Sequence, residues 1–447
     1  MQGDKMRGIS RAKWGRYAQL LKSNREFRKI WIGQSVNFLG DSFYDIALMW
    51  YVYAVTGSAT QSGLVLVFIF LPSIVFGIWF GPLIDRTNRK PWLVLTSALQ
   101  AIAITGFGVL AVTGHFLLWA IYLISFLLAT GEVAMGPAFT SAIPDLVSEE
   151  LLVTANAMLS TTHQLFRLLG SIFGGVVIAS VGMSSAFFID AVSFAVAALY
   201  FAMTAIPLRA GDLGSSAGPG ARGSIWADIK TGTKWLTSRR NLLMILIVAT
   251  ISNMGLAPTN VLPAMYLKKV MHAGPTALGI FDAAIGFGVV LGAVWLGTKS
   301  IKRIGLWFTW SIVMQGVGLG IVGVAPHIWV SMVGNFILGM AVSMAGIPLS
   351  TMFQALVPRD MRGRVSSITG AVASLSIPVT YGFVGILADG IGARWTYGWG
   401  AICLVLAGMA AFAMKTVRET RLTSHVSESA GPDVRRMQET YETTQAN

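Results

Sequence analysis

The sequence predicts an all-α membrane protein with about twelve transmembrane helices in two pseudo-symmetric six-helix bundles. Its 447 residues are 54% hydrophobic and only 12% charged, with a mean hydropathy of +0.65, whereas a soluble domain carries roughly 25% charged residues. Uncharged runs of about 20 residues, long enough to cross a bilayer, recur along most of the chain. A polar stretch near the middle divides these runs into two sets of six.

Each apolar run predicts one helix, bounded by polar residues, glycine or proline. The third helix is expected to begin at Pro91, because proline is favoured in the first helical turn. In the first half we expect helices at 27–55, 59–84, 91–112, 116–143, 151–181 and 185–206. In the second half we expect helices at 242–267, 276–296, 306–324, 328–353, 365–387 and 395–414.

Polar segments flank and separate the two bundles. Residues 207–223 are rich in glycine and serine, as flexible linkers are, and 224–238 have the apolar spacing of an interfacial amphipathic helix. The predicted divisions are a basic arm at 1–26, a bundle at 27–206, a linker at 207–240, a second bundle at 241–416 and a tail at 417–447.

The placement of the basic residues predicts the orientation of the chain. The net charge is +13, which in a soluble protein would suggest nucleic acid as a partner. Here nearly all 33 Lys and Arg fall on one side of the membrane if both termini are cytoplasmic, as the positive-inside rule requires. The exceptions are Lys268, Lys269, Arg394 and Arg167. We therefore expect a multi-pass protein of the cell membrane and no nucleic-acid partner.

The two halves of the chain carry an internal repeat. Leu146 and Leu356 begin matching Leu-Val pairs, and Gly182 matches Gly392; both offsets are 210 residues (356 − 146 and 392 − 182). A parallel repeat of two bundles is typical of transporters that hold their substrate between the halves near the membrane midplane.

The most specific motif is the stretch 81–91, Gly-Pro-Leu-Ile-Asp-Arg-Thr-Asn-Arg-Lys-Pro. It resembles the signature Gly-x-Leu-Ala-Asp-Arg-x-Gly-Arg-Lys between helices 2 and 3 of the major facilitator superfamily. Ile84 and Asn88 depart from it, although Asn tolerates the left-handed backbone of the usual glycine. The resemblance implies a charge relay that holds the cytoplasmic gate shut; the alternative is an ordinary basic loop. The implied gating residues are Gly81, Asp85, Arg86, Arg89 and Lys90.

Two further phrases narrow the resemblance to a subfamily. The stretch 356–367, Leu-Val-Pro-Arg-Asp-Met-Arg-Gly-Arg-Val-Ser-Ser, and the stretch 33–45 in the first helix are similar to bacterial macrolide-efflux and enterobactin-export proteins. The resemblance covers roughly residues 27–416. It implies a secondary active transporter that works by alternating access and exports an amphipathic small molecule, such as a drug, macrolide or siderophore-like metabolite, in exchange for protons.

Charged residues inside the apolar runs are the candidates for substrate binding and proton coupling. Each costs about 2.5–3.5 kcal/mol at a helix centre on insertion scales, so those that occur are expected to face a cavity or a partner. Asp190, near the outer end of its helix, is expected to be solvated. The candidates for coupling are Asp41, Asp45, Glu132, Arg167 and Asp282.

Asp41 and Asp45 are four residues apart and share a helix face. Two carboxylates close together in a low dielectric resist ionising at the same time, which would suit a site that takes up and releases a proton. The alternative for Asp41 is polar packing beside Asn37.

Glu132 and Arg167 lie in consecutive helices and are expected to form an ion pair, either structural or sensitive to protons and substrate. His163, one turn before Arg167, could relay protons, although packing is the commoner role of a lone histidine. Asp282 lies in the first turns of its helix, where the helix dipole favours a carboxylate.

The sequence contains no catalytic or cofactor-binding motif. The run 286–292, Gly-Phe-Gly-Val-Val-Leu-Gly, imitates a nucleotide fingerprint but has no strand before it, so we interpret it as a site of close helix packing. We find no ATP site, metal-ligand cluster or nucleophile elbow, and expect neither an enzyme nor a cofactor. The expected partners are a small-molecule substrate, protons and the lipid bilayer, bound by a monomer. The alternatives are a membrane sensor that does not transport its ligand and a carrier that imports a metabolite.

Overall fold

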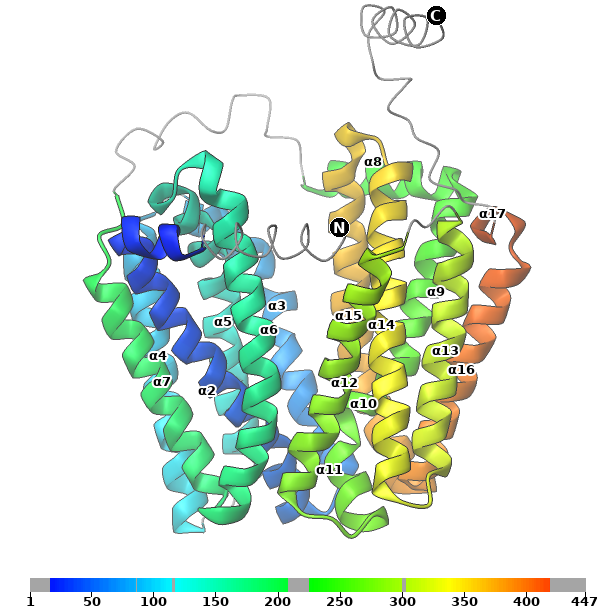
Figure 1. The fold of residues 1–447 in the computed structure, drawn as a ribbon, viewed down its shortest axis with the longest axis horizontal. Helices are drawn as coiled ribbons and strands as arrows, with labels where there is room; N and C mark the ends of the chain where they lie inside the picture. Colours follow the sequence, from blue (N-terminus) through cyan, green and yellow to red (C-terminus); the bar gives the residue numbers. More distant parts are fainter. Residues whose placement is uncertain (1–16, 86, 115–116, 208–224, 300–302, 419–447) are drawn as a thin grey trace, which may run out of the picture.

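The computed structural model describes residues 17–85, 87–114, 117–207, 225–299 and 303–418. In this part of the chain the structure is helical, without a strand. The long helices stand side by side in two bundles (Figure 1). We call the end at which the first long helix begins the upper end, and the opposite end the lower end, as Figure 1 draws them.

The N-terminal bundle contains α2 (Arg25–Thr56), α3 (Ala59–Asp85), α4 (Arg89–Thr113), α5 (Leu118–Leu146), α6 (Glu149–Ser180) and α7 (Met183–Met203). The short helix α8 (Ile225–Ser238) lies at the upper end (Figure 1). The C-terminal bundle contains α9 (Arg240–Leu256), α10 (Pro258–Val261), α11 (Pro263–Met265), the π-helical turn η1 (Tyr266–Val270), α12 (Pro275–Gly297), α13 (Ile304–Val324), α14 (Ile328–Leu356), α15 (Arg359–Ile391), α16 (Ala393–Ala413) and α17 (Lys415–Arg418).

Eleven helical segments of the described chain are long and apolar enough to cross a membrane. The first long helix, α2, is not among them although it has 32 residues, because Asn37, Asp41 and Asp45 interrupt its apolar sequence. With α2 the bundles hold the six and six long segments that the sequence predicts, so the all-α fold is confirmed.

The turn after α3 is shorter than the motif 81–91 suggests. Gly81–Asp85 continue α3 to its end, and α4 begins at Arg89 rather than at Pro91. Asn88 is the N-cap of α4: its side chain accepts a hydrogen bond from the Lys90 amide at 3.1 Å, as capping asparagines do. Its backbone is extended, with a φ of −69°, so the tolerance of asparagine for a left-handed backbone is not used here.

The seventh long segment is broken, where the sequence pattern predicted one continuous helix over 242–267. The chain passes from α9 through α10 and α11 to η1, and the breaks fall at Pro258 and Pro263. Proline has no amide hydrogen to bond the preceding turn. The segment therefore bends near the lower end, beside the boundary between the two bundles.

The apolar cores show where the bundles join. One cluster at the upper end contains only N-terminal residues, such as Phe27, Leu93 and Phe201. Another contains only C-terminal ones, such as Leu242 and Val365. The largest cluster runs through both bundles and includes the lower-end residues Tyr53, Ala59, Ile178, Met265, Leu278 and Ala388. The bundles thus share a core at the lower end and have separate cores at the upper end, where they stand apart in Figure 1.

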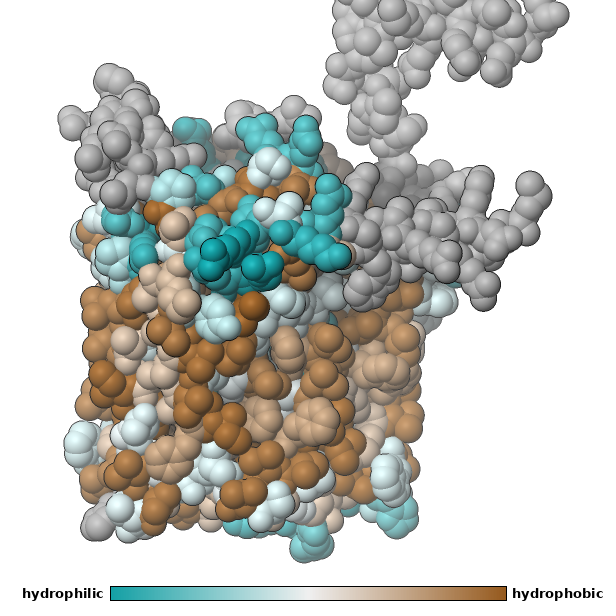
Figure 2. All heavy atoms as spheres, turned by 60° about the vertical axis from the view of Figure 1, so that its left-hand side comes forward, coloured by the Kyte–Doolittle hydropathy of each residue, from teal (hydrophilic) through white to brown (hydrophobic). Residues whose placement is uncertain are grey.

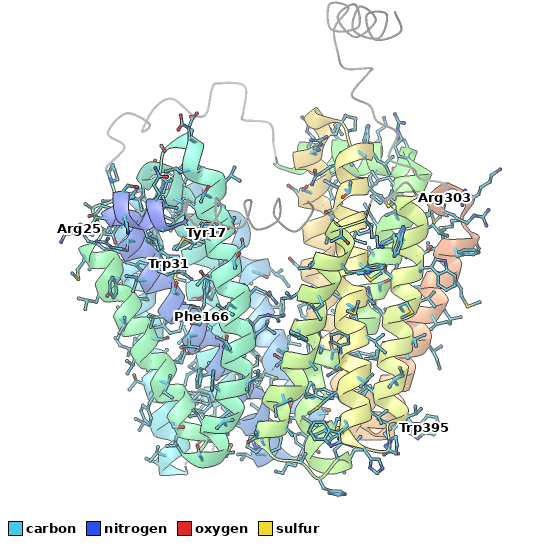
Figure 3. The ribbon with its side chains drawn as sticks, viewed as in Figure 1. Tyr17, Arg25, Trp31, Phe166, Arg303 and Trp395 are labelled. Atoms are coloured by element: carbon cyan, nitrogen blue, oxygen red, sulfur yellow. The ribbon has the colours of Figure 1, made fainter. Side chains whose placement is uncertain are left out.

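The surface has an apolar belt below a polar upper end (Figure 2). Arg25 and Arg303 lie at the upper end, and Trp395 lies at the lower end (Figure 3). Trp119, Trp329 and Trp395, each at the lower end of a helix, are 62%, 72% and 74% exposed. Exposed tryptophans are typical of the level where a bilayer meets water. The chain is a multi-pass membrane protein.

Candidate functional site

Two carboxylates near the middle of the N-terminal bundle reach water inside the protein. Asp45 of α2 and Glu132 of α5 have exposed side chains. Both are nevertheless enclosed by protein atoms. A side chain that is accessible while helices surround it lies in a space between those helices, and we call the space at Asp45 and Glu132 the cavity.

The charged neighbours of Asp45 come from both bundles. They are Asp282 of α12, Arg167 of α6 and Glu132 of α5. Among the described residues none forms a hydrogen bond to the Asp45 carboxylate, which leaves its oxygens available for a ligand. The structure therefore brings four of the five predicted coupling residues together around one cavity.

Arg167 extends toward the C-terminal bundle. A Cβ atom placed on Gly286 of α12 would lie 3.8 Å from its Nη2 atom and 2.4 Å from Leu168 Cδ2. A side chain at position 286 would require the end of the Leu168 side chain to move, so glycine there favours the close approach of α6 to α12. Arg167 is thus the one basic group that the described residues place at the boundary of the bundles near Asp45.

The expectation of an ion pair between Glu132 and Arg167 was wrong. Ion pairs in the described chain join Glu26 to Lys29 and Arg89 to Asp145, and Glu132 has a different partner. Its carboxylate accepts a hydrogen bond of 3.1 Å from Gln100 Nε2. The reason is the helix arrangement: α5 packs mainly against α3 and α4, whereas α6 packs against α2 and α12. Neighbours in sequence are not neighbours in space here.

Gln100 is a site residue that the sequence reasoning missed. It is 2% exposed on α4, and its Nε2 also donates to the Leu128 carbonyl at 3.1 Å. A glutamine in the middle of an apolar run was the available signal, because a buried amide must find partners. It holds Glu132 at the cavity wall.

Asp282 is held by a hydrogen bond across the bundle boundary. Ser171 Oγ of α6 donates to its Oδ2 at 2.7 Å. One turn below, a Cβ on Gly279 would lie 2.0 Å from the Ser171 carbonyl oxygen, so the backbones of α6 and α12 touch. Asp282 is two turns inside α12, too deep for the effect of the helix end, which fades within the first turn.

Asp41 lies behind the cavity. Its Oδ2 accepts a hydrogen bond from Asn37 Nδ2 at 3.2 Å, as the packing alternative expects, and its charged neighbours are Asp190, Glu132 and Asp45. Asp190, expected to be solvated, is instead 0% exposed. It accepts a hydrogen bond of 3.0 Å from Ser193 Oγ. It also packs against Gly40, where a Cβ would lie 2.5 Å from its Oδ1 atom. The prediction was wrong because α7 turns this face toward α2.

The predicted gating motif lies at the upper end and is described in part. Arg89 Nη1 donates to Asp145 Oδ2 at the end of α5, a partner that the sequence reasoning did not identify. Their side chains are 14% and 6% exposed. Gly81 faces open space, and Lys90 is half-buried. Arg86 and the side chain of Asp85 lie outside the described residues.

Two helix pairs close the lower end. In the first, α3 meets α15: a Cβ on Gly63 would lie 2.5 Å from the Tyr381 carbonyl oxygen, and one on Gly385 2.7 Å from that of Ala59. In the second, α6 meets α12, where a Cβ on Gly175 would lie 2.7 Å from the Pro275 carbonyl oxygen. We call these contacts the lower gate. Because they leave no space for side chains, the cavity is closed below.

The fold and the closed lower gate are those of a known class of transporter. The family model described as "Major Facilitator Superfamily" matches residues 30–381. The chain belongs to the major facilitator superfamily. It is therefore a transport protein and not an enzyme. No group of three or more His, Cys, Asp or Glu side chains in the described chain could hold a metal ion.

Curated relatives cover nearly the whole chain. Macrolide efflux protein A of Streptococcus pyogenes is 25% identical over 387 residues, which are 86% of this chain and 94% of that protein. The enterobactin exporter EntS of Citrobacter koseri is 24% identical over 89% of this chain and 91% of its own length. The multidrug efflux pump Tap of Mycolicibacterium fortuitum is 24% identical over 86% of this chain and 94% of its own length. These relatives are similar to this chain over most of its length, and they include the two kinds of efflux protein that the motifs resemble.

Solved structures share the fold at low identity. A mutant form of the nucleoside transporter NupG aligns with a TM-score of 0.71 at 13% identity, over 87% of this chain and 100% of that one. A bacterial homologue of the human lysosomal transporter Spinster, in an inward-facing and unoccupied conformation, aligns with a TM-score of 0.70 at 14% identity. The alignment covers 89% of this chain and 98% of that one. These similarities concern the fold alone.

Proposed function

We propose that this protein exports an amphipathic cation across the cell membrane in exchange for protons, by alternating access. The observation that carries the proposal is the enclosed, water-accessible cavity at Asp45 and Glu132, next to one arginine and closed at the lower gate. Relatives named as efflux proteins for macrolides, enterobactin and multiple drugs support the direction of transport.

The charge balance of the cavity favours a cationic substrate. Among the described residues, the charged neighbours of Asp45 are the acids Asp282 and Glu132 and a single base, Arg167, and Asp41 adds a further acid behind them. A cleft with low-dielectric walls and an excess of one charge concentrates ligands of the opposite charge. An anionic siderophore would be repelled by each of these carboxylates that is ionised, whereas an amphipathic amine would find a partner for its ammonium group.

Proton exchange follows from the same residues. A carboxylate that binds a substrate ammonium must be ionised, and one that releases it can do so by taking up a proton. Asp45 is suited to this competition, because water reaches it and no described residue occupies its oxygens by hydrogen bonding. Arg167 and Glu132, both charged neighbours of Asp45, would adjust the balance between proton and substrate.

The membrane orientation in this proposal places the upper end in the cytoplasm. Arg25 and Arg303 lie at that end (Figure 3), together with the motif Arg89 and Lys90, and short basic loops remain on the cytoplasmic side. The cavity then opens inward, the state in which an exporter loads its substrate. The upper-end motif, including Asp85 and Arg86, would close the cytoplasmic side in the other half of the cycle.

The test is accumulation of ethidium, an amphipathic aromatic cation, in energised cells that express the protein. We expect lower accumulation than in cells without the protein, and loss of that difference when a protonophore removes the proton gradient. Asp45→Asn should abolish export at normal expression, because the amide can neither pair with a cation nor exchange a proton.

The matched control is Glu150→Gln, which makes the same type of change at an exposed position in the first turn of α6. It should export normally. Export by Asp45→Asn at the rate of the unmodified protein would contradict the assignment of Asp45. Export that survives the protonophore would contradict proton coupling.

A further inference from the structure

The turn between α2 and α3 is held at the lower end by a residue of the other bundle. Asp389, near the end of α15, accepts three hydrogen bonds from it. Its Oδ1 accepts from the Ala59 amide at 2.8 Å, and its Oδ2 from the Thr60 amide at 2.9 Å and Ser58 Oγ at 2.6 Å. Asp389 is 331 residues from Ser58, so these bonds cross the boundary between the bundles.

This arrangement is a helix N-cap provided by a distant segment. The first amides of any α-helix have no partner within the helix, and a residue such as Ser58, directly before α3, normally supplies one. Here the Ser58 hydroxyl donates to Asp389, and its oxygen reaches the Gln61 amide only at 3.4 Å. The carboxylate also places a negative charge at the positive end of α3.

The same turn is bound on its other side by a basic residue of the C-terminal bundle. Lys268 of η1 donates from Nζ to the Ala54 carbonyl at 3.2 Å, in the last turn of α2. A cation is favoured at the C-terminal end of a helix for the same reason that an anion is favoured at the N-terminal end. Two opposite charges of one bundle thus complement the two helix ends that meet at Gly57 of the other.

The backbone geometry fixes both partners in place. Gly57 has a φ of 64°, a left-handed conformation that glycine adopts without strain, and its amide bonds the Tyr53 carbonyl at 2.9 Å. One turn before Asp389, Gly385 touches the backbone of α3. The carboxylate therefore meets the helix start only when α3 and α15 are in contact.

We propose that Asp389 and Lys268 are positioning residues that set the equilibrium of the transport cycle by clamping the α2–α3 turn while the lower gate is closed. Opening the lower end separates α3 from α15 and must break every one of these bonds. Their loss therefore favours the state that is open at the lower end. The inference goes beyond the proposed export function and does not depend on the substrate, because the equilibrium exists without one.

The experiment measures the distance between two spin labels across the lower end. Thr113→Cys at the end of α4 and His327→Cys before α14 are exposed positions, one in each bundle. The native cysteine, Cys403, is replaced by serine. The full-length protein in lipid nanodiscs, without substrate, should show a short distance for the closed lower gate and a longer one for the open gate.

Asp389→Ala should increase the ratio of the long to the short distance about five-fold, the size expected for a lost N-cap. Asp389→Asn should have a smaller effect, because an amide oxygen can still accept from one amide of α3. Lys268→Met should shift the ratio in the same direction. Lys269→Met removes the same charge from the next residue and is the control.

Unchanged distances in Asp389→Ala, with the thermal stability of the unmodified protein, would overturn the proposal. An effect of Lys269→Met equal to that of Lys268→Met would also overturn it, because charge alone would then explain the shift. If Asp389→Ala does not fold, Asp389→Asn and Ser58→Ala test the same bonds, and unchanged distances in both would decide against the clamp. Since no substrate is added, failure of the export proposal leaves this result unaffected.

Discussion

Gln100 donates a hydrogen bond of 3.1 Å to Glu132 and so links α4 to the cavity wall on α5. The second bundle has a similar glutamine without the acid. Gln315 of α13 donates to the Ala341 carbonyl of α14 at 3.3 Å, as Gln100 donates to the Leu128 carbonyl of α5. The repeated contact is a structural link between two helices of each bundle. In the N-terminal bundle the glutamine also bonds a carboxylate, that of Glu132.

Gln100→Leu is therefore expected to reduce transport more than stability. The variant loses the bond to Glu132, and the carboxylate can then turn away from its position at the cavity. We expect initial rates of ethidium export to fall about ten-fold, with a loss of about 1–3 kcal/mol in stability, because the variant removes the bonds to both Glu132 and the Leu128 carbonyl.

Gln315→Leu is the matched control, because it removes the equivalent helix link from the other bundle. It should lose a similar amount of thermal stability and keep its export rate. Equal losses of export in the two variants would show that Gln100 has only the structural role.

Ser171→Ala tests the cross-bundle bond to Asp282. The variant removes the 2.7 Å donor and leaves a half-buried carboxylate without it, which costs about 1–3 kcal/mol in the closed state of the lower gate. We expect a shift toward the state open at the lower end, measured as faster modification of Gly382→Cys in the contact between α15 and α3, where a Cβ fits at 3.8 Å from Val67 Cγ2.

The control for this measurement is Ser180→Ala, at the lower end of the same helix, whose hydroxyl bonds only carbonyls of α6 itself. It should leave the rate of modification unchanged. A rate in Ser171→Ala equal to that of the control would mean that the bond to Asp282 does not stabilise the closed gate.

The sequence was sufficient to predict the twelve long segments, apart from the breaks in the seventh, because a transmembrane run leaves a long apolar signal that tertiary context cannot override. The internal repeat and the three motif stretches could also be recognised in the sequence, because each is made of short runs of adjacent residues. The run 286–292 was correctly interpreted as packing: Gly288 and Gly292 approach the backbone of α14 at Phe336 and Met340.

The pairing of side chains could not be predicted in the same way. The expected partner of Glu132 was Arg167, on the next helix, but the helix order in space places Gln100 there instead. Asp190 was expected to be solvated because it lies near the outer end of its helix. The sequence did not show which face of α7 packs against α2, so the burial of Asp190 could not be predicted. The Asp389 clamp joins residues 331 apart, and a carboxylate near a helix end gives no sign of capping another helix.

The Arg89–Asp145 ion pair predicts a double-mutant cycle at the upper end. Asp145 is only 6% exposed, so Arg89→Met leaves its charge without this partner, and breaking one side of a buried pair costs about 3–5 kcal/mol. We expect a lower melting temperature and loss of export in Arg89→Met and in Asp145→Asn.

The double variant Arg89→Met with Asp145→Asn should regain part of the stability, because neither charge then remains buried without the other. It should still fail to export if the pair has the gating role that the motif implies. Recovery of export together with stability would assign the pair to folding alone.

Close packing of α12 on α14 predicts opposite effects for two glycines of one helix. A Cβ on Gly339 would lie 2.0 Å from the Ile285 carbonyl oxygen, whereas one on Gly346 would meet nothing within 4 Å. Gly339→Ala must push the helices apart, and overpacking of this kind costs about 1–3 kcal/mol. Gly346→Ala gains the better helix propensity of alanine, about 1 kcal/mol. The melting temperature in detergent should therefore fall for Gly339→Ala and stay the same or rise for Gly346→Ala. Both substitutions add the same methyl group to the same helix, so a fall of equal size in both would contradict the packing account.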